Sequence, residues 1–212
     1  MKELTPEKAL VFRIAHIGNV PWMLANGLHC RKSHVCDPNF IEIGNPDLIS
    51  KRAHRVVPIA PGGTLADYVP FYFTPFTPML LNIKTGYNGM KQTAMRDIVI
   101  LVSSLHRLQE LGLQFVFTDR HAYLAAAVFA DNLADLVNID WKILQARDFK
   151  RDPNDPGKME RYQAEALVYQ QAQLDVLLGL VCHGPEQEAH LNELVQAANV
   201  NLKVIARRGW YV

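Results

Sequence analysis

Apolar and polar positions alternate along this chain in short segments, which predicts many short elements rather than a few long ones. The run from Ala9 to Ile17 is rich in β-forming residues, so we expect a first strand with His16 at its end. The next segment, 19–27, has apolar residues at helical spacing and stops at Gly27, which indicates a short helix with a glycine C-cap. Further strands are predicted at 98–102, 114–118, 165–168 and 200–205.

Helical spacing returns in several later segments. Helices are expected at 47–52 behind an N-cap at Asn45, at 104–111, at 141–147 and at 186–198. The Ala-rich stretch 121–136 is also predicted to be helical. Two proline-interrupted segments, 65–73 and 79–83, favour irregular or edge strands. The stretch 149–158 contains too many Asp, Pro, Asn and Gly residues to pack and predicts an exposed loop.

These elements define a fold class. Short strands are mixed with scattered helices and lack the regular strand-helix alternation of a doubly wound sheet, which predicts an α+β fold. No repeat, low-complexity tract or long linker divides the 212 residues. With 49% hydrophobic and 20% charged residues, we expect one domain over residues 1–212, and a monomer is the default.

Composition says little about partners and more about the compartment. The formal net charge is +1, so any site for a polyanion must be a local patch. Three cysteines without framework spacing fit a reducing compartment better than a disulfide-linked secreted protein. The N-terminus is charged where a signal peptide would be apolar, and no apolar stretch is long enough to span a bilayer. We therefore expect a cytoplasmic protein without a membrane partner.

Common ligand motifs are missing or weak. Neither a G-x-G-x-x-G nor a G-x-x-x-x-G-K-[ST] sequence occurs, which disfavours Rossmann and P-loop mechanisms. A crowded group of possible metal ligands comprises His29, Cys30, His34 and Cys36. Structural zinc sites usually draw ligand pairs from separated segments, so this group is interpreted as an ordinary polar loop and no metal is predicted.

Glu165 differs from the other scattered polar residues because a carboxylate here begins an apolar strand directly after an exposed loop. A charge that faced the core would cost several kcal/mol unless it were paired, so Glu165 is expected to face a cleft or a cation. A lone glutamate is nevertheless more often a structural residue than a catalyst.

With these residues in view, the sequence resembles the DarT family of bacterial DNA ADP-ribosyltransferase toxins along nearly its whole length. The segments that carry the resemblance are Ala15-His16-Ile17-Gly18-Asn19-Val20-Pro21, Ile43-Gly44-Asn45 with Lys51-Arg52, Pro61-Gly62-Gly63-Thr64-Leu65-Ala66-Asp67-Tyr68-Val69-Pro70-Phe71-Tyr72-Phe73, Phe117-Thr118-Asp119, Asp140-Trp141 and Gln163-Ala164-Glu165-Ala166-Leu167-Val168. The long Gly-Gly-Thr block and the Gln-Ala-Glu segment are the most specific.

The resemblance implies an ADP-ribosyltransferase fold, in which two small packed β-sheets and surrounding helices form an NAD cleft. It implies that Glu165 and Arg52 are catalytic and that His16, Asn19, Arg52 and Tyr72 contact NAD, the co-substrate. The product would be an ADP-ribosyl adduct on thymidine in single-stranded DNA, although a guanine-directed branch exists. The expected antidote is a separate macrodomain-type antitoxin similar to DarG.

The resemblance also implies that the loop before Glu165 meets the nucleic acid. Four cations flank it, namely Lys150, Arg151, Lys158 and Arg161. They predict phosphate contacts, while simple solubility is an equally good reading. For Trp141, core packing is favoured over stacking on a base. The family often has Pro-Arg-Ser-Pro where this chain has Pro75-Phe76-Thr77-Pro78, so the cation of that loop is missing, and Ala166 stands where Phe is common.

Chemistry agrees with these roles, because cleavage of the nicotinamide–ribose bond creates positive charge that a carboxylate can stabilise. Two rivals remain open. One is an NAD-dependent transferase that acts on guanine, RNA or protein. The other is a catalytically silent nucleic-acid-binding module in which Glu165 merely pairs with Arg161 or Arg52.

Overall fold

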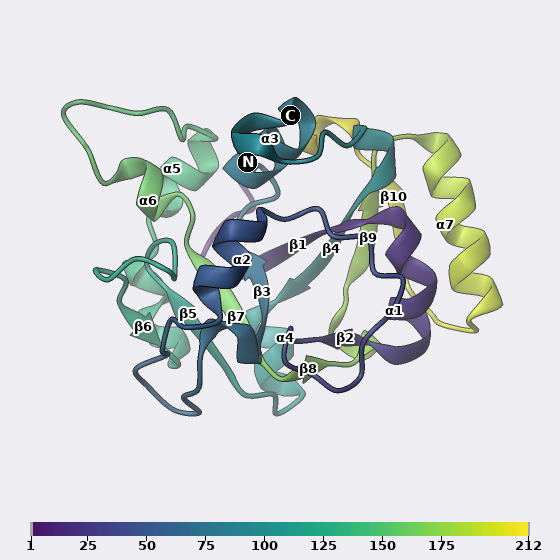
Figure 1. The fold of residues 1–212 in the computed structure, drawn as a ribbon, viewed down its shortest axis with the longest axis horizontal. Helices are drawn as coiled ribbons and strands as arrows, with labels where there is room; N and C mark the ends of the chain where they lie inside the picture. The colour runs from purple at the N-terminus through teal and green to yellow at the C-terminus, as the bar shows by residue number, and fades with distance from the viewer. Residues whose placement is uncertain (1, 212) are drawn as a thin grey trace.

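A computed structural model describes residues 2–211 of the chain. Its large sheet has eight strands in the order β10-β9-β4-β1-β3-β7-β5-β6, and a small second sheet pairs β2 with β8 (Figure 1). The strands are β1 (Leu10–His16), β2 (Leu28–His29), β3 (Tyr68–Tyr72), β4 (Ile98–Ser104), β5 (Phe115–Thr118), β6 (Phe129–Ala130), β7 (Glu165–Tyr169), β8 (Gln171–Ala172), β9 (Gly179–Cys182) and β10 (Val204–Ala206). The α+β class is confirmed, with one large and one small sheet.

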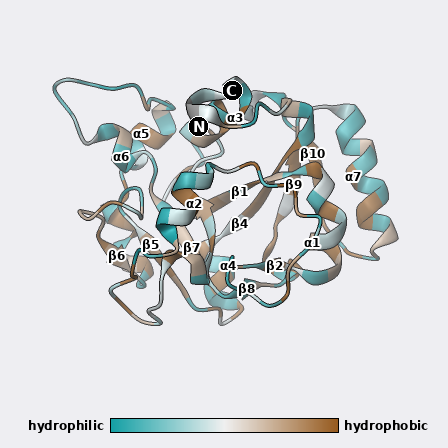
Figure 2. Cartoon of the chain, viewed as in Figure 1, coloured by the Kyte–Doolittle hydropathy of each residue, from teal (hydrophilic) through white to brown (hydrophobic). Residues whose placement is uncertain are grey.

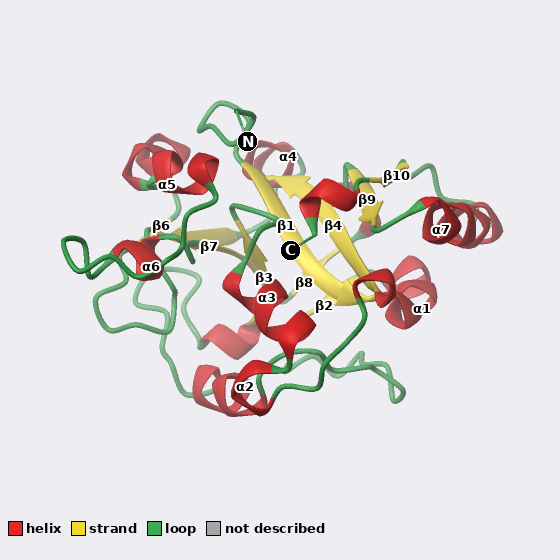
Figure 3. Ribbon diagram, turned by 90° about the horizontal axis from the view of Figure 1, so that it is seen from above, coloured by secondary structure: helices red, strands yellow, loops and turns green. Residues whose placement is uncertain are grey.

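Helices surround the large sheet. They are α1 (Val20–Asn26), α2 (Pro46–Arg52), α3 (Pro78–Thr85), α4 (Leu105–Glu110), α5 (Trp141–Ala146), α6 (Lys158–Arg161) and α7 (Pro185–Ala197). Seen from above, α7 and α1 lie at one end of the sheet, α5 and α6 lie at the other, and α2 and α3 stand on one side of it (Figure 3). Among residues 2–211, no helix combines the length and apolarity needed to cross a bilayer.

The core follows the two-residue period of the strands, whose side chains alternate between the faces of a sheet. Strand β7 illustrates this, because Ala166 and Val168 join the main apolar core, whereas Leu167 joins a smaller cluster on the other face. Figure 2 shows the same contrast, with mainly apolar strands and polar outer surfaces on helices such as α7. Glu165 is two residues before Leu167 in the strand and points to the same face, so it lies on the face opposite the main core.

Local capping explains several correctly predicted boundaries. The Asn45 side chain accepts a hydrogen bond from the Leu48 N–H at the start of α2, and Ser104 caps α4 in the same way through Arg107 N. Helix α1 ends at Gly27, whose φ of +82° favours glycine. The predicted strands and these helices are therefore confirmed, with bounds shifted by a few residues.

The prediction of irregular or edge strands for the two proline-interrupted segments was wrong in two ways. Strand β3 is interior and not an edge strand, and residues 79–83 belong to helix α3. Pro70 is tolerated because only Phe12 and Tyr72 pair directly between β1 and β3, while the Arg13 guanidinium donates a hydrogen bond to Pro70 O at 3.0 Å. Thr77 caps α3, and Pro78 occupies its first turn, where its missing N–H has no cost.

The predicted helix at 121–136 was also wrong. Asp119 organises this stretch instead, because its carboxylate accepts a hydrogen bond from Val128 N at 2.9 Å and its own N–H donates to Val128 O. These bonds bring β6 beside β5, and a 3-10 helix follows at Leu133–Asn138. Tertiary pairing has overridden the helix propensity of the alanines.

Candidate active site

Glu165 begins β7 directly opposite Tyr72 of β3. Its backbone N–H donates to the Thr118 hydroxyl at 3.2 Å, which fixes the strand start against the end of β5. The side chain is only 1% exposed, yet it lines the main cavity of the protein and does not pack into the apolar core. The expectation that this carboxylate faces a cleft and a cation therefore agrees with the geometry.

Three groups surround the Glu165 carboxylate. Arg52 Nη1, at the end of α2, lies 3.1 Å from Oε1 and 2.9 Å from Oε2. His121 Nδ1 lies 3.1 Å from Oε1, and Ala122 N donates to Oε1 at 3.0 Å. Burial alone would raise the pKa of Glu165, but the Arg52 charge and the bonds from His121 and Ala122 outweigh it and lower the pKa to about 2. Glu165 is therefore ionised at neutral pH.

His121 and Ala122 were not predicted as site residues. Asp119, just beyond the end of β5, was the nearest signal in the sequence, and the chain turns there. Because a helix was predicted at 121–136, no turn was expected here, and His121 and Ala122 were not expected to contact β7. His121 contacts the carboxylate only because the segment 119–128 folds back along β5.

The cavity beside Glu165 has a volume of about 480 Å³, which lies within the range of small-molecule sites. It is bounded by β1, α1, the segment 31–45, α2 and β3. Among residues 2–211, two buried polar atoms on its lining side chains have no hydrogen-bond partner, Arg13 Nε and Arg52 Nη2, and Glu165 Oε2 contacts only Arg52 Nη1. Buried polar groups are normally satisfied, so these atoms indicate a polar ligand.

His16 and Tyr72 also line this cavity. The His16 Nδ1 accepts a hydrogen bond from Gly18 N at 3.0 Å, which leaves Nε2 to carry the proton of the neutral ring. Burial lowers the pKa of His16 and favours that neutral form. Burial, with the nearby Glu165 charge, raises the pKa of Tyr72, so its hydroxyl keeps its proton, which it donates to Met79 Sδ at 3.5 Å.

Asn19 lines the cavity too, but its side chain is already used. Its Nδ2 donates to Ile41 O at 3.0 Å, and its Oδ1 accepts from Ile41 N at 2.9 Å. The residue is 1% exposed. This two-point clamp attaches the segment 31–45 to the start of α1, so Asn19 shapes the wall of the cavity rather than presenting a free amide to it.

The segment 31–45 has a second attachment. Lys32 Nζ contacts Thr64 Oγ1 and Asp67 Oδ2, both at 2.9 Å. The same Asp67 carboxylate accepts from Thr64 N and Thr64 Oγ1 in a capping box. Gly63 must be small here, because a Cβ would lie 2.9 Å from Asp67 Oδ2 and φ is +77°. Part of the long Gly-Gly-Thr block is thus structural and holds the cavity wall.

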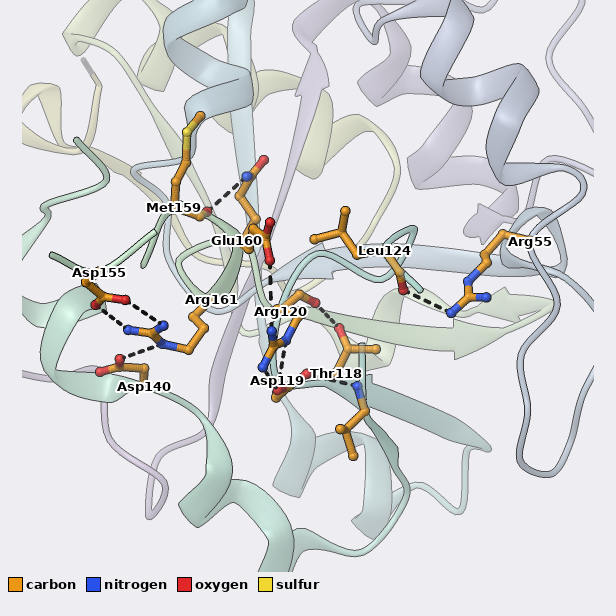
Figure 4. A network of polar contacts seen from close by, with 12 residues as sticks. Arg55, Thr118, Asp119, Arg120, Leu124, Asp140, Asp155, Met159, Glu160 and Arg161 are labelled. Carbon is orange, nitrogen blue, oxygen red and sulfur yellow. Dashed lines mark hydrogen bonds and ion pairs between the residues drawn. The ribbon is translucent and has the colours of Figure 1, made fainter. Parts of the chain in front are cut away.

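The four predicted DNA-contacting cations differ in their surroundings. Lys150 and Arg151 are exposed, and no ion pair of theirs is found in the described part of the chain. Lys158 is 9% exposed and lies 2.6 Å from Asp148. Arg161 is held between Asp140 and Asp155 at 3.1 and 2.6 Å (Figure 4). Lys158 and Arg161 therefore fix the loop, and a phosphate would have to compete with these carboxylates.

The aromatic residues near this loop pack against one another. Trp141 stacks edge-on against Phe73 and donates from Nε1 to Leu136 O at 2.8 Å, so its interpretation as a packing residue is confirmed. Phe76 is 7% exposed, and the Arg147 guanidinium lies 3.7 Å above its ring. Arg147, which follows α5, thus places a cation beside position 76, where the family often has an arginine.

Comparison with known proteins decides the family. A model of the DarT family, described as ssDNA thymidine ADP-ribosyltransferase, matches residues 12–212. The chain belongs to the DarT family. A DNA ADP-ribosyl transferase of Escherichia coli O127:H6 is 51% identical over 208 residues, which cover 98% of this chain and 95% of that protein. Another, from Thermus sp. strain 2.9, is 39% identical over 80% of this chain and 78% of that protein.

Solved DarT structures agree with this assignment. The structure of Thermus sp. 2.9 DarT in complex with ADP-ribosylated ssDNA superposes with a TM-score of 0.91 at 31% identity and covers both chains completely. The complex of the same DarT with NAD+ gives a TM-score of 0.87, with coverage of 98% of this chain and 99% of the other. The resemblance to the DarT family and its fold, predicted from the sequence, is therefore confirmed.

Proposed function

We propose that this chain cleaves the nicotinamide–ribose bond of NAD and transfers the ADP-ribose to thymidine in single-stranded DNA. The observation that carries the proposal is the ionised Glu165 carboxylate at the wall of the cavity, where its Oε2 contacts only the Arg52 guanidinium. Family membership, together with the NAD+ and the ADP-ribosylated ssDNA in the complexes of Thermus DarT, supports the same substrates. We propose that residues 1–212 act as one domain.

In this mechanism NAD occupies the 480 Å³ cavity with its reactive ribose beside Glu165. The bond between ribose C1 and the nicotinamide nitrogen breaks, the electron pair leaves with neutral nicotinamide, and the ribose becomes cationic. The Glu165 carboxylate stabilises that charge because it is ionised and fixed before the reaction begins. Arg52 keeps it ionised, and Arg52 Nη2 still has a proton to donate to the ligand.

A ring nitrogen of the acceptor base then bonds to C1, and the N–H proton of that base is released. Glu165 is positioned to accept this proton or to hold a ribose hydroxyl, and Arg52 can stabilise negative charge that develops on the base. Neutral His16 and the Tyr72 hydroxyl supply hydrogen bonds to NAD. Asn19 acts indirectly, through the clamp on Ile41.

Labelled NAD separates this function from its rivals. The protein is incubated with NAD labelled in the ADP-ribose part and with separate pools of single-stranded DNA, RNA and protein. Label in the DNA pool alone is expected. Label in RNA or protein would support the alternative transferase, and label on guanosine-only oligonucleotides would support the guanine-directed alternative. Absence of both label transfer and nicotinamide release would support a silent binding module, in which Arg52 simply neutralises Glu165.

Two further predictions follow from family membership. A macrodomain-type antitoxin would reverse the modification, which can be tested by adding such a protein to the modified oligonucleotide. We also propose that the protein acts on DNA in the cytoplasm and that it is a monomer. Sedimentation at several concentrations would test the monomer.

A further inference from the structure

A second hollow lies next to the NAD cavity. Its volume is about 410 Å³, and it is lined by Asn45, Asp47, Leu48, Lys51 and Tyr123. Asn45 and Leu48 line the NAD cavity as well, so the two hollows adjoin at the start of α2. The mechanism above gives this second hollow no role.

Its position follows from the contacts of the catalytic carboxylate. Ala122, which donates its N–H to Glu165 Oε1 at 3.0 Å, directly precedes Tyr123. Arg52, whose guanidinium pairs with the same carboxylate, directly follows Lys51. The two chemically distinctive residues of the hollow are thus the immediate chain neighbours of two residues that touch Glu165. The hollow therefore adjoins the segments that hold Glu165, although Glu165 itself lines only the NAD cavity.

Tyr123 is an exposed aromatic residue on a fixed piece of backbone. Its side chain is 36% exposed. The segment is tied on one side through Ala122 to Glu165 and on the other through Leu124, whose carbonyl accepts from Arg55 Nη2 at 2.9 Å (Figure 4). A ring that is exposed yet anchored at both neighbouring residues is preorganised to offer its face to a flat partner.

The remaining groups of the hollow match a nucleotide. Lys51 is exposed, and no ion pair of its side chain is found among residues 2–211, so it can contact a phosphate. Asp47, also exposed, offers a carboxylate that repels phosphate but can accept a hydrogen bond from the N–H edge of a base. A base against Tyr123 and a phosphate at Lys51 satisfy both preferences.

We infer that this hollow is a base-binding subsite for the acceptor DNA strand, in which a base stacks on Tyr123 while Lys51 contacts the backbone. The inference rests on the proposed function and specifies where the acceptor strand lies relative to NAD. Stacking on an aromatic side chain is tolerant of base identity, so the subsite contributes affinity and register rather than the choice of the modified base.

The test compares Tyr123→Ala, Tyr123→Phe and Lys51→Gln with the unchanged protein. Oligonucleotide affinity is measured directly by fluorescence anisotropy, and KM values for oligonucleotide and NAD are measured by nicotinamide release. Tyr123→Ala should weaken oligonucleotide binding about 5- to 100-fold and leave the KM for NAD unchanged, and Tyr123→Phe should bind nearly normally. Lys51→Gln should reduce the slope of log affinity against log salt by about 0.7. Tyr87→Ala is the matched control, since Tyr87 is a 63% exposed tyrosine outside both hollows.

An abasic scan identifies the stacked base. If one base of the oligonucleotide lies on Tyr123, the abasic change at that position should abolish the difference between Tyr123→Ala and the unchanged protein, while other abasic positions preserve it. Unaltered affinity in Tyr123→Ala, or an equal loss at every abasic position, would overturn the inference. In that case the unchanged protein would still modify DNA, whereas failure of the proposed function would appear as absence of DNA modification by the unchanged protein itself.

Discussion

Arg52 and Glu165 are 113 residues apart in the sequence, and their charged groups meet at 2.9 Å beside the main cavity. Arg52 comes from the last turn of α2 and Glu165 from the first residue of β7. The pair keeps a nearly inaccessible carboxylate ionised, and Oε2, which contacts only Arg52, can still accept a hydrogen bond from a ligand.

Removal of Arg52 should therefore affect both catalysis and stability. In Arg52→Ala the Glu165 carboxylate loses its counter-charge, so activity should fall at least about a hundredfold and the free energy of unfolding by about 3 kcal/mol. The double variant Arg52→Ala/Glu165→Ala should be more stable than Arg52→Ala, because it contains no uncompensated buried charge. Urea unfolding measures this comparison. A double variant that is less stable than both single variants would contradict an electrostatic coupling between Arg52 and Glu165.

The depressed pKa of Glu165 fixes the sign of a pH effect. The pKa is about 2 in the folded protein and 4.5 as the ordinary value, so ionised Glu165 stabilises the fold above pH 4.5, and this contribution is lost as the pH falls from 4.5 toward 2. Between pH 6 and pH 3, the unchanged protein should lose more stability than Glu165→Gln. Denaturant unfolding of both proteins at the two pH values measures the difference, and equal losses would show that the carboxylate is not depressed.

The clamp between Asn19 and Ile41 predicts a separation of kinetic constants. In Asn19→Ala the segment 31–45 loses both hydrogen bonds to α1, so the KM for NAD should rise about tenfold while kcat changes little. Asn26→Ala serves as the control, because Asn26 is the last residue of α1, the helix that follows Asn19, and its side chain bonds only to Trp22 O. A fall in kcat at unchanged KM would instead indicate that Asn19 acts on the reacting groups.

The loop cations should divide into two groups by salt dependence. Lys150→Gln and Arg151→Gln should each reduce the slope of log DNA affinity against log salt by about 0.7, as expected for a lost contact to a single-strand phosphate. Lys158→Gln and Arg161→Gln should mainly lower stability, since these cations are paired with carboxylates in the loop. Thermal unfolding and salt titrations separate the two effects. An unchanged slope in all four variants would place the DNA elsewhere.

Local sequence signals were enough to predict the elements that carry the central pair. Asn45, a residue type common at helix N-caps, predicted the start of α2. An acidic residue before an apolar run predicted the start of β7. Both signals depend on neighbouring residues, which the sequence presents directly. The assignment of Glu165 and Arg52 as catalytic residues came from the family resemblance, and the cost of burying a charge indicated that Glu165 faces a cleft or a cation.

Contacts between distant segments could not be predicted in this way. His121 reaches Glu165 because Asp119 turns the chain back toward β6, and local helix propensity points to the opposite result. The engagement of Asn19 with Ile41 depends on a pairing across 22 residues. Pro70 looked incompatible with an interior strand, but β1 pairs directly with β3 only at Phe12 and Tyr72, and the Arg13 guanidinium satisfies the Pro70 carbonyl.

The central claim is that Glu165 drives transfer of ADP-ribose from NAD to thymidine in single-stranded DNA. Mass analysis of thymidine- and guanosine-containing oligonucleotides after reaction with NAD tests it most directly, with the unchanged protein and Glu165→Ala side by side. The account predicts one ADP-ribose on thymidine with the unchanged protein and at least about a hundredfold less product with Glu165→Ala. Equal product from both proteins would contradict it.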